Sequence, residues 1–123
     1  MSTRLFEGAD WDFTTRKNVR FWIRTTNPNL GGFQNPGPVI WLYGKNGTTK
    51  LEPSKGRNLL LDLPYSEARW SWLSMEVPLD VSADWVRKDT GSPDMHHVSA
   101  IGIALDSWGG DPFTVWLDGL RVE

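Results

Sequence analysis

Glycine and proline residues divide this chain into short segments. Twelve glycines and eight prolines occur among its 123 residues, and both residue types favour turns and interrupt helices. Between them, apolar and polar residues alternate with a period of two, which is the pattern of a strand with one buried face. We therefore expect an all-β fold, with no helix long enough to connect parallel strands.

The alternation predicts about eight short strands, which is typical of an antiparallel β-sandwich or barrel. The predicted strands are 4–7, 19–25, 39–43, 48–52, 58–63, 69–77, 98–106 and 113–122. Asn46-Gly47 predicts a hairpin between the third and fourth of them. Serine and proline signals for helix starts predict short helical turns over 82–88 and 92–95. The length fits one domain, residues 1–123.

Composition excludes several classes of protein. The chain has no cysteine, so it has no disulfide framework, no thiolate zinc site and no thiol nucleophile. It lacks an apolar run near the roughly 18 residues that a membrane span needs, and its first residues do not form a signal peptide. We expect a soluble domain that is either intracellular or cut from a longer chain.

Charge is distributed unevenly along the chain, although the net charge is only −2. Residues 13–57 hold eight basic residues and one acid, whereas residues 58–123 hold four basic residues and eleven acids. This asymmetry has two explanations, an anionic partner or two segments that interleave in one sandwich and cancel. The basic residues do not form the stripe that nucleic-acid binding requires, so nucleic acid is not an expected partner.

No catalytic constellation is visible in the sequence. The two histidines, His96 and His97, are adjacent, and neighbouring residues on a strand point to opposite faces, so at most one could serve a given site. Nucleophile and phosphate-binding motifs are absent, and no pair of acids has the context of a glycosidase. We expect a protein that is not an enzyme. The alternative is a small polysaccharide lyase that uses Tyr65 or His97 with Arg69.

Fifteen aromatic residues, eight of them tryptophans, are more than a core of this size requires, so we expect some rings on the surface. In the predicted strand 19–25, Trp22 stands between Arg20 and Arg24 on the face opposite the apolar residues. An exposed indole can stack on the apolar face of a pyranose, while guanidinium groups donate to its hydroxyls. This strand is therefore a candidate for carbohydrate binding.

Two further segments carry outward aromatic residues. In the predicted strand 39–43, Trp41 and Tyr43 share the face opposite the apolar residues, and Trp70 has the corresponding position in 69–77. If these rings open onto the same sheet face as Trp22, they form a platform the size of a polysaccharide segment. Otherwise they pack under the loop rich in proline and glycine, or form a second small core.

Three stretches of the sequence resemble a known family. They read "WDFTTRKNVRFWIRTTNPNLGGFQNPGPVIWLYGKNG", "WLSMEVPLD" and "VSAIGIALDSWGGDPFTVWLDGLRVE". In this order they are similar to the strands of galactose-binding-like β-jelly-roll carbohydrate-binding modules, which are attached to secreted bacterial polysaccharide-degrading enzymes. The resemblance covers about residues 11–123 and implies a jelly roll, with Trp72 as a structural indole and Trp116-Leu117-Asp118 in the closing strand.

The same resemblance implies a structural calcium ion where the chain ends meet. Asp118 has the place of the closing-strand ligand, and Glu7, Asp10 or Asp12 could add the further oxygens that calcium needs. The chain departs from the family in having few residues before the strand that contains Trp22. One or two strands of the family would then be missing, which would leave an exposed sheet edge for a neighbouring domain or a second copy.

We therefore expect a noncatalytic, extracellular module of a larger protein, with no membrane contact. It would bind a neutral β-glucan-like or mannan-like polysaccharide through Trp22, Trp41, Tyr43 and Trp70, with Arg20 and Arg24. One alternative is an accessory domain whose rings are buried and which packs against a covalently linked catalytic domain. Another is a module that binds or cleaves acidic polysaccharide.

Overall fold

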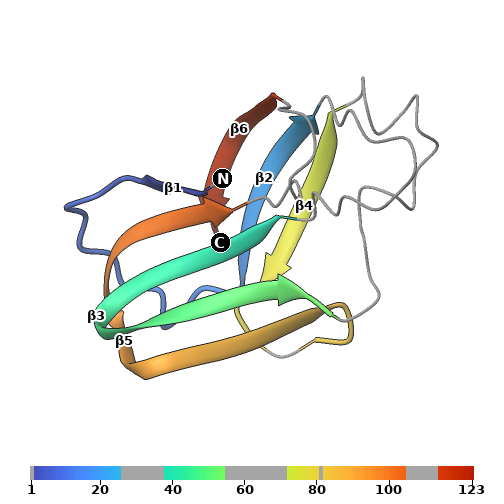
Figure 1. The fold of residues 1–123 in the computed structure, drawn as a ribbon. Helices are drawn as coiled ribbons and strands as arrows, with labels where there is room; N and C mark the ends of the chain where they lie inside the picture. Colours follow the sequence, from blue (N-terminus) through green and yellow to red (C-terminus); the bar gives the residue numbers. More distant parts are fainter. Residues whose placement is uncertain (1, 26–37, 55–71, 81, 105–113) are drawn as a thin grey trace.

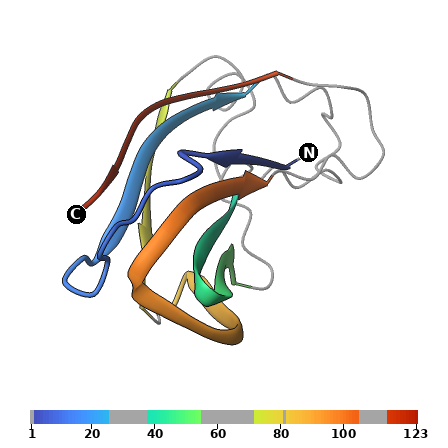
Figure 2. The same ribbon diagram turned by 90° about the vertical axis from the view of Figure 1, so that its left-hand side faces the viewer.

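The computed structural model describes residues 2–25, 38–54, 72–80, 82–104 and 114–123. They form six strands and no helix. The strands are β1 (Ser2–Leu5), β2 (Asn18–Thr25), β3 (Val39–Pro53), β4 (Leu73–Pro78), β5 (Trp85–Ala104) and β6 (Val115–Val122). Two three-stranded sheets, β1-β5-β3 and β4-β2-β6, contain only antiparallel pairs and lie as two layers (Figures 1 and 2). The expected all-β sandwich is confirmed.

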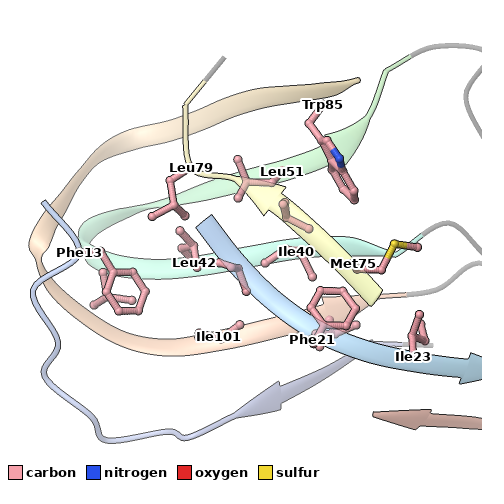
Figure 3. Packing of buried hydrophobic residues seen from close by; sticks show 14 residues of the cluster. Phe13, Phe21, Ile23, Ile40, Leu42, Leu51, Met75, Leu79, Trp85 and Ile101 are labelled. Atoms are coloured by element: carbon pink, nitrogen blue, oxygen red, sulfur yellow. The ribbon is translucent and has the colours of Figure 1, made fainter. Parts of the chain in front are cut away.

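One hydrophobic core fills the space between the two sheets. In β2 the apolar face predicted from the alternation is buried, since Val19, Phe21 and Ile23 have at most 1% of their surface exposed. Ile40 and Leu42 of β3 face them from the other sheet, and Figure 3 shows side chains of both sheets pointing into the shared space. Burying a side chain of this size stabilises the fold by about 1.5–3 kcal/mol. Outward neighbours of these residues therefore lie on the two outer faces of the sandwich.

Strands β3 and β5 pair along their whole length and turn back together near their middle (Figure 1). The bend in β3 lies at Asn46-Gly47, where Asn46 has a φ of 65°. A Cβ atom on Gly47 would overlap the carbonyl oxygen of Thr90, so only glycine lets the two strands approach here. The chain thus turns at the predicted Asn-Gly pair. Residues 39–43 and 48–52 nevertheless belong to one strand whose ladder is with β5, not to two strands paired with each other.

The two predicted helical turns are wrong, because residues 85–104 form β5. Ser82 Oγ does accept a hydrogen bond from the Trp85 backbone N–H at 3.1 Å, as an N-cap would. The chain then continues as a strand, since Trp85 is buried in the core and β3 supplies the hydrogen-bonding partners of the backbone. Tertiary pairing has overridden a local signal.

The other predicted strands overlap the observed ones where the structure describes them, although β4 begins at Leu73, β5 at Trp85 and β6 at Val115. β1 ends at Leu5 instead of residue 7, because Phe6 and Gly8 adopt positive φ values of 59° and 82° that turn the chain. The predicted strand 58–63 lies outside the described residues, as do parts of the predicted strands 69–77, 98–106 and 113–122. Within the described part, no helix has the length and apolarity that a membrane crossing needs.

Candidate functional site

The structure places the predicted binding residues on two opposite faces. Trp22 and Arg24 point outward from β2 in the sheet β4-β2-β6, whereas Trp41 and Tyr43 point outward from β3 in the other sheet. Because the inward neighbours of both sets meet in one core, the two sets face away from each other. The predicted single platform is therefore wrong. The last predicted ring, Trp70, lies outside the described residues.

Three exposed indoles lie on or beside the sheet β4-β2-β6, whose outer face we call the indole face. Trp22 on β2, Trp72 just before β4 and Trp116 on β6 have 45%, 42% and 40% of their surface exposed. The expectation that Trp72 is a structural indole is wrong, because so much of it meets solvent. Trp116 was not among the predicted binding residues, although strand parity could have found it, since Val115 and Leu117 on either side pack against the core.

Arg24 contacts one of these indoles. It is opposite Trp116 in the β2–β6 register, and its Cζ atom is 5.1 Å from the ring centroid of Trp116, a cation–π contact. The β2–β4 register ends with the pair Ile23 and Leu73. Trp72 directly precedes Leu73 in the chain, so it lies at the end of the sheet where this register ends. β4 and β6 lie on either side of β2, and strands are spaced about 4.8 Å apart, so residues on β4 and β6 are separated by roughly 10 Å.

Trp22 lies one step along the same strand, between Ser74 on β4 and Asp118 on β6. The β2–β6 ladder is irregular beside it, and Gly119 has a φ of 62°, as in a bulge that needs glycine. A Cβ atom on Gly119 would lie 3.4 Å from Cδ1 of Trp22. Asp118 Oδ1 accepts a hydrogen bond from the Gly119 N–H at 2.8 Å. The bulge thus determines the position of Asp118 next to the ring of Trp22.

Arg20 has one carboxylate partner on β4 and another directly after the end of β6. Its Nη2 atom is 2.6 Å from Glu76 Oε2, and its Nε atom is 2.8 Å from Glu123 Oε1. These pairs fix the side chain and compensate its charge. Arg20 was predicted to bind carbohydrate. In the structure its guanidinium is paired with Glu76 and Glu123, which favours a structural role for this side chain.

The opposite face carries a groove of about 420 Å³ over β1, β3 and β5, which we call the aromatic groove. Its walls include Trp41 and Tyr43, both half-buried. Each ring has a cation near it. Arg4 Cζ is 4.2 Å from the ring centroid of Tyr43, and Lys50 Nζ is 5.5 Å from that of Trp41. Trp41 and Tyr43 therefore present less open ring surface than the three indoles of the indole face.

Acidic and basic side chains neighbour the aromatic groove on β3 and β5. Glu52 Oε1 is 2.7 Å from Lys88 Nζ, and its Oε2 atom is 2.9 Å from Lys50 Nζ. Hydrogen bonds from Lys88 and then Lys50 lower the pKa of Glu52, against the opposing effect of its partial burial. Glu52 is therefore ionised at neutral pH and compensates one of the two lysines.

A cavity of about 570 Å³ opens between the two sheets beside β6. Its lining includes Leu120 and the parallel rings of Trp11 and Phe13, whose centroids are 5.9 Å apart. At its rim, Asp12 accepts hydrogen bonds from the hydroxyl and the N–H of Thr14. These bonds lower the pKa of Asp12 to about 2. They stabilise the turn itself, so the low pKa gives no sign of a catalytic role.

The residues predicted to bind calcium have other partners in the structure. Glu7 Oε1 is 3.8 Å from Arg4 Nη1, and Asp118 accepts the bond from its own neighbour described above. No group of three or more potential metal ligands occurs among the described residues. Of the residues named for a lyase, Tyr65 and Arg69 lie outside the described part, and His97 Nδ1 is 2.8 Å from Asp10 Oδ1. Both expectations stay predictions.

Comparison with known proteins does not add to this description. The chain matches no protein-family model, no curated protein and no solved structure. Function must therefore be inferred from the geometry of the faces. Among the described residues, the indole face combines the largest exposed rings with an arginine against one of them, and it is the best candidate for a binding site.

Proposed function

We propose that this protein is a noncatalytic module that binds polysaccharide on its indole face. The observation that carries the proposal is the exposure of three indoles, Trp22, Trp72 and Trp116, on or beside adjacent strands of one sheet, with Arg24 against the ring of Trp116. Isolated exposed apolar residues are common on protein surfaces, whereas three exposed indoles on or beside one sheet supply the apolar area that is typical of a binding site. The rings supply apolar area, and the guanidinium supplies donors for hydroxyl groups.

The position of the rings suits an extended sugar chain. β4 and β6 flank β2, so the three indoles are anchored on or beside adjacent strands and do not depend on each other for support. A ligand that crosses the strands meets rings over roughly 10 Å, which is the scale of a short oligosaccharide. Because strands hold the rings in place, little side-chain ordering is needed on binding.

Charge on this face favours a neutral ligand. Among the described residues on or beside this face, arginines and carboxylates occur in equal number, and several are paired with each other at 2.6–3.5 Å. The charged residues on or beside this face are Arg20, Arg24, Arg121, Glu76, Asp118 and Glu123. The local field is therefore weak. We propose a β-glucan-like or mannan-like chain as the ligand class.

The proposal also includes the strand topology of the domain and the kind of protein to which it belongs. We infer a jelly roll of about eight strands, related to the galactose-binding-like carbohydrate-binding modules that the sequence resembles. Such a module acts outside the cell as part of a larger protein, linked covalently to a catalytic domain. The two antiparallel sheets and the three sequence stretches support this assignment. A calcium ion at Asp118 and Glu7 remains part of it.

Affinity electrophoresis against β-glucans, mannans, xylans and uronate polymers tests the proposal. We expect retardation on a neutral β-glucan or mannan, loss of retardation in Trp116→Ala, and normal retardation in Trp41→Ala, which alters the opposite face. Absence of retardation on every polymer would contradict binding. Loss in Trp41→Ala with normal behaviour of Trp116→Ala would move the site to the other sheet.

The rival function, an accessory domain that packs against a catalytic domain, was expected to bury its rings. The exposure of Trp22, Trp72 and Trp116 argues against that form of it. Acrylamide quenching of tryptophan fluorescence separates the two functions in solution. We expect a substantial accessible fraction that bound oligosaccharide protects. An emission that acrylamide hardly quenches would favour the accessory domain.

A further inference from the structure

We propose that the aromatic groove is a second binding site, which takes sugars that carry a carboxylate. It lies on the sheet β1-β5-β3, on the side of the sandwich away from the indole face. It differs in chemistry as well, because each of its two rings has a cation near it. The proposal does not depend on what the indole face binds.

Gly102 of β5 forms the floor of the aromatic groove, next to Trp41 in the β3–β5 register. A Cβ atom at this position would lie 3.0 Å from Tyr43 Cε2 and 3.2 Å from both Trp41 Cβ and the Tyr43 hydroxyl. The missing side chain therefore lets both rings lie close to the backbone of β5 and keeps space above it. Thr3 and Thr48 line the same groove, and their hydroxyls can pair with sugar hydroxyls.

Arg4 is the residue in the aromatic groove best placed to recognise an anion. Its guanidinium lies over the ring of Tyr43, with Cζ 4.2 Å from the ring centroid, and the group carries five N–H donors in a planar fork. The ion pair of Arg4 with Glu7 measures 3.8 Å, which is longer than a hydrogen bond. A carboxylate in the groove can accept two parallel N–H bonds from such a guanidinium.

The surroundings of Lys50 add positive charge at the other ring. Lys50 and Lys88 share the single carboxylate of Glu52, so this trio has a net charge of one positive unit. Figure 1 shows why Lys50 comes near Trp41 although they are nine positions apart, since β3 turns back between them. Arg4, Lys50 and Lys88 together with their carboxylate partners Glu7 and Glu52 carry one net positive charge, and a cation lies at each ring. A sugar that carries a carboxylate is attracted by this positive charge, whereas a neutral sugar is not.

Isothermal titration calorimetry with trigalacturonate and its methyl ester tests this inference. The two ligands share one backbone and differ in charge, and sulfated dextran distinguishes a carboxylate site from a general anion site. We expect trigalacturonate to bind at least about tenfold more tightly than its ester, and Arg4→Gln to lose about tenfold, as for one charge-assisted pair. Lys50→Gln should show a smaller loss, because Lys50 already pairs with Glu52.

Two control variants complete the experiment. Arg16→Gln removes an exposed arginine beside the cavity between the sheets, and Trp22→Ala alters the indole face. Neither should change trigalacturonate affinity. The inference would be overturned by equal affinity for ester and acid, by tighter binding of sulfated dextran, by no loss in Arg4→Gln, or by an equal loss in Arg16→Gln. Loss in Trp22→Ala would show that uronate binds on the indole face instead.

Discussion

Replacing Trp22 with alanine gives the sharpest quantitative test of the indole face. An indole side chain has about 250 Å² of surface at most, and 45% of Trp22 is exposed, which leaves about 110 Å² open. A sugar stacked on one side covers roughly half of that, or about 55 Å². At about 25 cal/mol per Å² of apolar surface, the contact contributes about 1.4 kcal/mol. The expected result is therefore a loss of affinity of about tenfold.

Titration calorimetry with a soluble oligomer of the best polymer measures this loss, and thermal melts check the fold. Trp22 does not contribute to the core, so the melting midpoint of Trp22→Ala should change little. Trp41→Ala is the matched control, because it removes the same ring from the other sheet. A loss below about threefold in Trp22→Ala, or an equal loss in Trp41→Ala, would refute stacking on Trp22 as the source of affinity.

Four further outcomes follow from the structure. Thr49→Val removes the hydroxyl of a fully buried residue, which donates to Asp89 at 2.7 Å. Since Asp89 is partly solvated, we expect a loss of about 1 kcal/mol, seen as a midpoint lower by about 4 °C, and an unchanged midpoint would refute it. The lowered pKa of Glu52 means that its pairing stabilises the fold above its ordinary pKa of 4.5 and is lost as pH falls below that value. Urea melts of Glu52→Gln should accordingly lose less stability between pH 6 and pH 3 than wild type, and parallel pH profiles would contradict the assignment. Binding of a neutral polymer should depend weakly on salt, and a steep salt dependence that Arg24→Ala removes would instead indicate an acidic ligand. Calcium bound near Asp118 should raise the midpoint slightly relative to chelator, and identical melts would eliminate that site.

The alternation of apolar and polar residues was enough to predict much of the local structure. It gave the position of β2 and its inward face, because the side chains of a strand alternate whatever it pairs with. For the same reason it identified Trp22, Trp41 and Tyr43 as outward residues, which the structure confirms. The Asn46-Gly47 pair likewise marked a turn of the chain, since few residues adopt positive φ as readily.

The candidate site depended on partners that the sequence does not specify. Parity says that Trp22 and Trp41 face away from the core, but only the pairing of β2 with β4 and β6, and of β3 with β5, places them on opposite sheets. The neighbours of Arg24 are likewise set by register across strands. Trp116 is 92 positions away along the chain and 5.1 Å away in space.

In residues 82–95 the local sequence signal was misleading, because pairing with another strand decided the structure. Ser82 and Ser92-Pro93 carry local signals for helix starts, yet β5 runs through most of this segment. A helix there would leave the second half of β3 without a partner and would take Trp85 out of the core. Alternation with period two can be recognised within a single segment, without knowledge of the strand that it pairs with. The choice of partner is made by the whole chain, because only the assembled sheets bury both apolar faces and satisfy the backbone hydrogen bonds at once.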